Sequence, residues 1–183
     1  MNQLYFTALI PPAPLKDNIQ ELKLEIRNKF GSKHSLNAPP HITLLSPFRC
    51  EKKNRDTLNS LLKNFVQKLE PLEVTFDDFS TFPPKVVFID VVKSPELTEI
   101  QSKLEKVARS NPDIFNYNYD ERPYHPHLTL AFKDLDKSTF YDIWNKFKDQ
   151  EFQKSFEASQ LYLLKHNGER WVVANIFKLD AAN

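Results

Sequence analysis

Two short segments of the chain place a histidine two residues before a threonine. His41 and Thr43 lie in the sequence PPHITL, and His127 and Thr129 lie in the sequence HPHLTL. Side chains two residues apart in a β-strand point to the same face, so each histidine lies beside its threonine. The apolar residues between and after them point to the opposite face, toward a core. Each segment therefore predicts one imidazole and one hydroxyl side by side on an anchored surface.

Two such pairs suit the cleavage of a phosphodiester. The reaction needs one group that takes a proton from the nucleophile and another that protonates the departing oxygen. Imidazole titrates near neutral pH, so one of His41 and His127 can start neutral and the other protonated. The hydroxyls of Thr43 and Thr129 can donate hydrogen bonds to the non-bridging phosphate oxygens, where negative charge sits. A single His-x-Thr pair is a common coincidence, but two copies in matching surroundings favour this chemistry, which requires no metal and no cofactor.

Glycine is scarce, and its scarcity excludes several kinds of phosphate site. The chain contains two glycines, Gly31 and Gly168. A P-loop, a dinucleotide-binding turn and a kinase-type lid each need several glycines close together, because their backbones approach phosphate closely. A phosphate site in this chain must therefore be built from side chains.

The balance of charge limits the size of any nucleic-acid partner. Lys and Arg total 25 and Asp and Glu total 24, which gives a net charge of +1. Proteins that hold long nucleic acids by the backbone usually show a stronger basic bias. We expect the partner to be an RNA end, a short oligonucleotide or a cyclic nucleotide.

The predicted strands and helices that position the two motifs follow the same order twice. Helical spacing of apolar residues covers 15–30, 56–69, 95–110 and 138–147, and strands are predicted over 4–10, 41–47, 72–79, 86–92, 127–132, 156–165 and 170–179. Gly31 is expected to cap the first helix, and Asn167-Gly168 is a hairpin turn signal. The repeat predicts a boundary near Phe82–Lys85.

This pattern predicts an internally duplicated α+β fold. Strands interleaved with helices often form a parallel sheet, but the hairpin signal and the short turn at Phe82–Lys85 favour antiparallel pairing. We expect one domain over 1–183, made of two pseudo-repeated lobes of about 1–82 and 83–183. Two mainly antiparallel sheets should flank a central cleft, with the helices on the outside.

The sequence also gives expectations about location and assembly. Residues 1–10 have no basic segment and too few apolar residues for a signal peptide or a membrane span. The single cysteine, Cys50, cannot form an intramolecular disulfide, which suits a reducing compartment. We expect a cytoplasmic monomer that does not enter a membrane.

The motifs and their surroundings resemble the 2H phosphoesterase superfamily. The similarity includes the sequence RPYHPHLTL over 122–130, the strand that follows Phe82-Pro83 and the closing hairpin. The most similar group is the bacterial 2′-5′ RNA ligase-like group, whose members act as RNA 2′,3′-cyclic phosphodiesterases.

The resemblance implies metal-independent hydrolysis of a 2′,3′-cyclic phosphate on an RNA end or a small nucleotide. His41 would donate a proton to the leaving oxygen, His127 would accept one, and Thr43 and Thr129 would bind phosphate. The same site could join ends as a 2′-5′ RNA ligase by microscopic reversibility, although hydrolysis should dominate in water.

Three further residues are candidates for substrate binding. Related chains often carry an arginine facing the cleft at the position of Arg122, where a guanidinium either holds phosphate or remains a solvated loop charge. Tyr124 either stacks on a base or packs the loop, and packing is the favoured interpretation. Phe48, just beyond the first motif, has the same two interpretations.

His125 forms a His-x-His sequence with His127, which raises the possibility of a metal site. The third histidine of a histidine triad would fall at Thr129, and no Asp, Glu or Cys lies nearby in the sequence at a ligand spacing. We therefore predict no metal site. His34 and His166 lie beside predicted turns and are expected on the surface.

A second hypothesis belongs to another class of function. Leu45-Ser46-Pro47 follows the first motif, where the RNA ligase-like enzymes more often continue with an aromatic residue and a glycine. Together with the near-neutral charge, this difference leaves open an RNA- or nucleotide-binding module with the same cleft but no significant turnover. The substrate-selecting loops are expected at 33–38 and 111–124.

Overall fold

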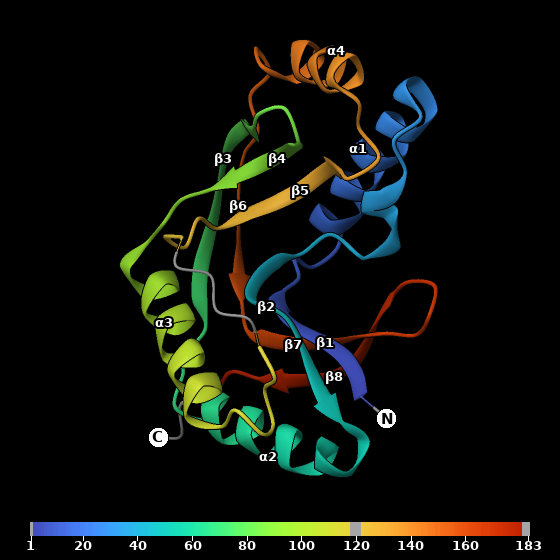
Figure 1. The fold of residues 1–183 in the computed structure, drawn as a ribbon. Helices are drawn as coiled ribbons and strands as arrows, with labels where there is room; N and C mark the ends of the chain where they lie inside the picture. Colours follow the sequence, from blue (N-terminus) through green and yellow to red (C-terminus); the bar gives the residue numbers. More distant parts are fainter. Residues whose placement is uncertain (1, 118–121, 181–183) are drawn as a thin grey trace.

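A computed structural model describes residues 2–117 and 122–180 (Figure 1). The helices are α1 (Leu15–Phe30), α2 (Arg55–Val66), α3 (Pro95–Ser110) and α4 (Lys137–Phe147), with short 3-10 helices η1 (His34–Asn37) and η2 (Lys52–Asn54). The strands are β1 (Asn2–Leu9), β2 (Ile42–Glu51), β3 (Leu72–Phe82), β4 (Val86–Val91), β5 (His127–Phe132), β6 (Gln153–Ala158), β7 (Gln160–His166) and β8 (Trp171–Lys178). Part of the predicted loop 111–124, residues 118–121, lies outside the described residues.

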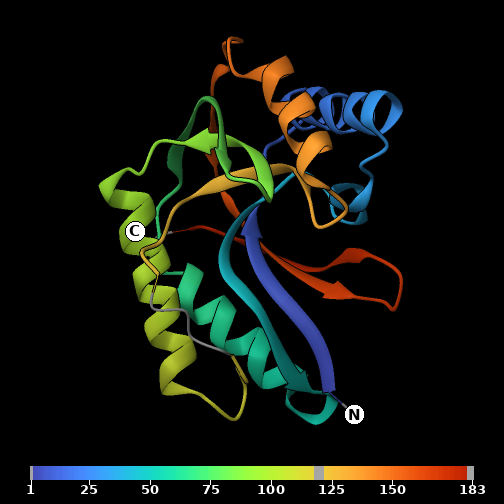
Figure 2. The same cartoon turned by 45° about the horizontal axis from the view of Figure 1, so that its top comes forward.

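The strands of the described residues form two four-stranded sheets. Their orders are β2-β1-β7-β8 and β5-β4-β3-β6, and every pairing is antiparallel. The long pair of β1 and β2 is clearest in Figure 2. The predicted two-lobed α+β fold with antiparallel sheets is confirmed.

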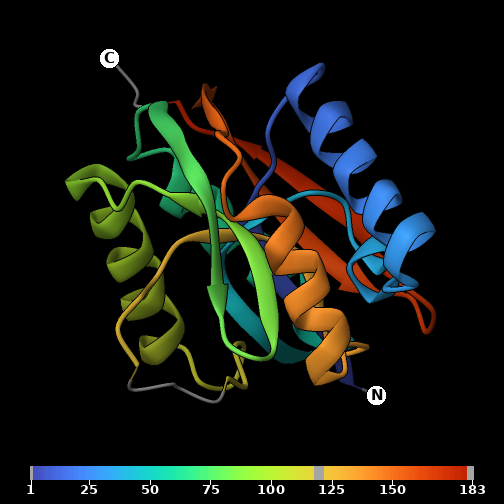
Figure 3. The same ribbon diagram turned by 90° about the horizontal axis from the view of Figure 1, so that it is seen from above.

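Two helices, α1 and α3, each pack against a strand from the other half of the sequence. The helix that connects β1 to β2, α1, contacts β5 and α4, whereas the helix that connects β4 to β5, α3, contacts β2 and β3 (Figures 1 and 3). Each His-x-Thr strand is therefore contacted by the connecting helix of the other half. No helix in the described part of the chain is long and apolar enough to cross a membrane.

The two sheets do not follow the division of the sequence at residue 82. Strand β3 comes from the first half but pairs with β4 and β6, and β7 and β8 come from the second half but extend the sheet of β1 and β2. The chain changes sheets at Ser159, whose carbonyl accepts a hydrogen bond of 2.9 Å from the Leu179 N–H. The prediction of one strand over 156–165 is wrong, because this segment ends β6 and begins β7 without a glycine or proline between them.

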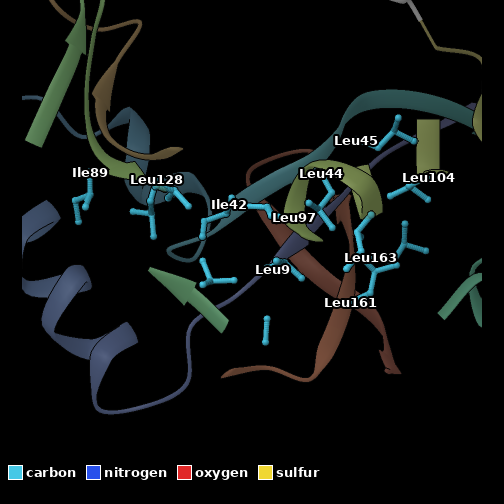
Figure 4. Packing of buried hydrophobic residues seen from close by; sticks show 14 of the residues in the cluster. Leu9, Ile42, Leu44, Leu45, Ile89, Leu97, Leu104, Leu128, Leu161 and Leu163 are labelled. Atoms are coloured by element: carbon cyan, nitrogen blue, oxygen red, sulfur yellow. The ribbon is translucent and has the colours of Figure 1, made fainter. Parts of the chain in front are cut away.

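The core lies behind the two motifs. Ile42 and Leu44 of β2, like Leu128 and Leu130 of β5, are at most 2% exposed, and all four belong to one buried cluster. Figure 4 shows Ile42 between Leu128 on one side and Leu44 on the other. Alternation along each strand therefore turns the histidine and threonine of each motif away from the core, and these side chains are half-buried.

Candidate active site

The structure brings the two His-x-Thr motifs together where β2 and β5 contact each other. His41 lies directly before β2, and His127 is the first residue of β5. Thr43 lines two cavities. One of these cavities also includes His41 and Thr129 in its wall, and the other includes His127. Thr43 is thus the residue of the two motifs that the walls of both cavities share.

Each imidazole is held by the backbone in the same way. The Nδ1 atom of His41 lies 2.7 Å from the carbonyl oxygen of Pro39, and that of His127 lies 2.7 Å from the carbonyl oxygen of His125. A carbonyl can only accept a hydrogen bond, so Nδ1 carries the proton in both rings. The neutral form of each imidazole consequently has its free lone pair on Nε2, which is ready to accept a proton.

The imidazole rings of His41 and His127 each contact an aromatic side chain from the neighbouring strand. The ring centroids of His41 and Phe6 are 4.8 Å apart, and those of His127 and Phe88 are 4.9 Å apart. Phe6 lies in β1 and Phe88 in β4, the strands that pair with β2 and β5. Trp171 supports Phe6 in turn with a centroid distance of 4.6 Å. The two histidines therefore occupy matching positions in the two sheets.

The surroundings make both histidines hard to protonate in the absence of substrate. Burial is the main cause that lowers the pKa of His41 to about 4, and the positive charge of Lys23 also opposes its protonation. Burial lowers the pKa of His127 as well, and the hydrogen bond to the His125 carbonyl opposes this shift. The charge of the His125 side chain lowers the pKa further, whereas Asp90 raises it. A bound phosphate would raise the pKa of both rings, because an adjacent negative charge stabilises imidazolium.

The cavity on the side of His127 has a volume of about 590 Å³. This size lies in the range typical of sites for small molecules. Its walls combine aromatic rings with polar side chains, as expected of a surface that binds a nucleobase. The lining residues are Thr43, Leu44, Ser46, Phe82, Gln101, Glu105, Tyr117, Arg122, Pro123, Tyr124, His125 and His127.

The cavity on the side of His41 is smaller, with a volume of about 230 Å³, and is more basic. Among the described residues in its wall there is no Asp or Glu. The lining residues are Phe6, Lys23, His34, Ser35, Asn37, Ala38, His41, Thr43, Pro47, Thr129, Phe132, Lys133 and Trp171.

Two of the three further candidates lie at the larger cavity. The exposed side chain of Arg122 lines it. Tyr124 lines it too, and its hydroxyl donates a hydrogen bond of 3.1 Å to the carbonyl oxygen of Thr43. Burial raises the pKa of Tyr124 well above its usual range, so the phenol remains a donor. Tyr124 thus fastens its loop to the first motif while one side of it faces the cavity.

Phe48 lies in the core, and its proposed contact with substrate does not fit this position. Its side chain is 1% exposed and packs against Phe115, with a centroid distance of 4.9 Å, and against Tyr5. The register of β2 against β1 shifts twice between Thr43 and Phe48, and Phe48 lies on the buried side of the strand. The ring has no open face for a base.

Two further histidines lie near the site, His125 beside Asp90 and His34 in the wall of the smaller cavity. His125 Nε2 lies 2.9 Å from Asp90 Oδ1, a partner that the sequence spacing did not reveal because Asp90 is on the neighbouring strand β4. Within 2–117 and 122–180, His, Cys, Asp and Glu side chains nowhere gather in a group of three or more that could hold a metal. His34 lines the smaller cavity instead of standing free on the surface, with its ring 4.8 Å from that of Phe132.

Lys23 is the buried charged residue of the smaller cavity, and the sequence interpretation did not single it out. It is 2% exposed, and its Nζ donates hydrogen bonds to the carbonyl oxygens of Ser35 (2.9 Å) and Ala38 (3.2 Å). Burial lowers the pKa of Lys23 to about 8, so the group is still mostly charged at neutral pH. A signal was available, because Lys23 follows Ile19 by four residues and precedes Ile26 by three, which puts a lysine on the buried face of α1.

The fold and the paired strands define a 2H phosphoesterase. The chain belongs to the 2′-5′ RNA ligase superfamily, whose family model matches residues 11–170. It is 28% identical over 166 residues to a Bacillus cytotoxicus protein named "putative phosphoesterase", a match that covers 88% of this chain and 90% of the relative. A Staphylococcus epidermidis protein with the same name is 25% identical over 176 residues, covering 94% and 96% of the two chains.

Solved structures share this fold. The Thermus thermophilus protein TT0787 superposes with a TM-score of 0.70 at 16% identity, covering 99% of this chain and 100% of that one. Escherichia coli LigT in complex with 3′-AMP superposes with a TM-score of 0.64 at 19% identity, covering 98% and 99%. At this level of identity, the likeness concerns the fold alone.

Proposed function

We propose that this chain is a metal-independent phosphodiesterase that hydrolyses a 2′,3′-cyclic phosphate on an RNA end or a small nucleotide. The observation that carries the proposal is the matching arrangement of His41 and His127. In each ring Nδ1 lies 2.7 Å from a backbone carbonyl oxygen, and each ring lines a cavity whose wall includes Thr43. LigT structures with 3′-AMP, ATP and NADP⁺ support a nucleotide as the ligand.

The mechanism follows from the two imidazoles. The neutral imidazole accepts a proton from water through Nε2 while the water oxygen bonds to phosphorus. The bond from phosphorus to one ribose oxygen breaks, and the protonated imidazole gives its proton to that oxygen. Thr43 and Thr129 donate hydrogen bonds to the non-bridging oxygens, whose negative charge is greatest in the transition state. The product is a nucleoside 2′- or 3′-phosphate.

The charged neighbours give the two histidines different tendencies. Lys23 opposes a proton on His41, whereas Asp90 favours a proton on His127. His127 is therefore the first of the two to be protonated as the pH falls. This order favours His127 as the acid and His41 as the base, which is the reverse of the roles that the family resemblance implies.

A panel of cyclic phosphates tests the proposal. Purified protein in excess chelator is given a 2′,3′-cyclic mononucleotide, an oligonucleotide with a 2′,3′-cyclic end and ADP-ribose cyclic phosphate, and the products are identified by ³¹P NMR. We expect turnover of at least one substrate in the presence of chelator. Binding of a 3′-phosphate oligonucleotide without cleavage of any substrate would instead identify a binding module. Joining of RNA ends in the reverse assay would show 2′-5′ ligation.

The dependence of kcat/KM on pH should be bell-shaped, because one imidazole must be neutral and the other protonated. This parameter reports the groups of the free enzyme. The acidic limb should lie near pH 4, where His41 titrates, and the alkaline limb, set by His127, should lie below pH 6.5. Asp90→Asn removes the charge that favours a proton on His127, so it should move the alkaline limb to lower pH.

His125→Gln is the matched control with the opposite sign. The charge of the His125 side chain lowers the pKa of His127, while the His125 carbonyl, which raises it, stays in the variant, so the substitution should move the alkaline limb to higher pH. The position of the limb, rather than the maximal rate, is the measurement. Unchanged alkaline limbs in both variants would mean that His127 does not set this limb.

A further inference from the structure

Lys23 is a buried ammonium group without a negatively charged partner. In the described ranges 2–117 and 122–180, no carboxylate lies within ion-pair distance of its Nζ. The carbonyls of Ser35 and Ala38 accept two of its three N–H groups. Burying a charge without a partner of opposite sign costs free energy. An anion that enters the site would remove this cost.

The smaller cavity supplies a place for such an anion. Lys23 shares its wall with two other basic side chains, His34 and Lys133. His41 and Thr129 of the reacting site line the same cavity. A negatively charged group next to the reacting phosphate would meet these basic side chains in a wall without Asp or Glu, whereas the wall of the larger cavity combines Arg122 with Glu105.

The sizes of the two cavities indicate which part of the substrate each one can bind. A volume of about 230 Å³ is below the 300–1,000 Å³ typical of sites for whole small molecules, so the smaller cavity fits a single group. Both walls contain aromatic side chains, but only the larger of these two cavities, of about 590 Å³, falls within the range that accommodates a nucleobase with its ribose. Thr43 belongs to both walls and marks the position of the reacting phosphate between them.

We propose that Lys23 binds a second phosphate group of the substrate, separated from the reacting phosphate by one ribose. The inference rests on the proposed function and narrows its substrate class. The favoured substrates are cyclic phosphates whose ribose carries a 5′-phosphate, either free or as part of an RNA chain or a pyrophosphate. Cyclic phosphates of plain nucleosides, which lack this group, are poorer substrates.

The experiment compares adenosine 2′,3′-cyclic phosphate with and without a 5′-phosphate. The wild-type protein should show a kcat/KM about 10- to 100-fold higher for the 5′-phosphorylated substrate, the range expected of one charge-assisted hydrogen bond. Lys23→Met should bring this ratio close to one, and Lys23→Arg should retain most of it. Calorimetry with adenosine 3′,5′-bisphosphate and adenosine 3′-phosphate gives the same ratio for binding, independently of turnover.

Lys23 also supports η1, so a second variant separates charge recognition from structural support. Asn37 lies in η1 and lines the smaller cavity with an exposed side chain. Asn37→Asp adds a negative charge there while leaving Lys23 in place, and it should lower the ratio. Gln101→Ala, in the wall of the larger cavity, should leave the ratio unchanged.

Two results would overturn the proposal. One is a wild-type ratio near one in both turnover and binding. The other is an equal loss for both substrates in Lys23→Met with the ratio intact, which would mean that Lys23 only supports the backbone. A bisphosphate preference that depends on Lys23 in a protein without turnover would uphold the anion subsite while the proposed hydrolysis failed.

Discussion

Replacement of either His41 or His127 by alanine should lower kcat/KM for the cyclic phosphate substrate by about 10²–10⁴-fold, the range of one general acid or base. Both rings are half-buried at the cavities and packed on Phe6 or Phe88, so the substitution removes proton transfer without opening the main core. Circular dichroism should show that both variants are folded. Full activity in both variants would contradict acid-base catalysis by these residues.

Substitutions of Thr43 and Thr129 should lower the activity less than substitutions of the two histidines. Thr43→Val and Thr129→Val each remove one hydrogen bond to a charged phosphate, worth about 1.5–3 kcal/mol, and should cost about 10- to 150-fold. Serine at either position keeps the hydroxyl and should restore most of the activity. The double variant His41→Ala/His127→Ala should lose little more than the worse single variant, because an acid and a base that act in one step are not additive.

A substrate with an activated leaving group distinguishes the acid from the base. A nucleotide p-nitrophenyl ester expels p-nitrophenolate, which needs no proton to depart. The variant that lacks the acid should therefore recover on this ester, whereas the variant that lacks the base should remain inactive. Recovery of His127→Ala would agree with the charges around the site, and recovery of His41→Ala would agree with the roles implied by the family.

Local periodicity explains why the centre of the site was predictable from sequence. The alternation of a strand places His41 beside Thr43 without any knowledge of tertiary structure, and the second motif repeats the pattern. Lys23 and Asp90 belong to other elements, and their proximity to the histidines depends on helix packing and strand register. Each carried a weak local signal, since Lys23 interrupts the buried face of α1 and Asp90 interrupts an apolar strand.

Longer-range features of the fold left no comparable signal. The change of sheet at Ser159 follows a segment whose apolar pattern continues on both sides, so a single strand was the natural expectation. Likewise, the contact of α1 with β5 is decided by which apolar faces meet after collapse. The elements were predictable from the sequence, whereas their exchange between the two sheets was not.

Phe48→Ala should destabilise the protein by about 3–5 kcal/mol, the usual cost of emptying a buried phenylalanine site. Phe48 is 1% exposed and packs on Tyr5 and Phe115 behind the first motif. Urea denaturation measures the loss. At a temperature where the variant is fully folded, its kcat/KM should be close to that of the wild type, because the ring lies in neither cavity wall.

Two other phenylalanines serve as controls for this interpretation. Phe115→Ala, also at 1% exposure, should lose comparable stability. Phe82 is 37% exposed, lines the larger cavity and places its ring 5.2 Å from that of His127. Phe82→Ala should therefore lose less stability but lower kcat/KM by about 5- to 100-fold, as expected for a ring that stacks on a base. If Phe48→Ala lost as much activity per folded molecule as Phe82→Ala, Phe48 would have to reach the substrate in a conformation that exposes this part of the core.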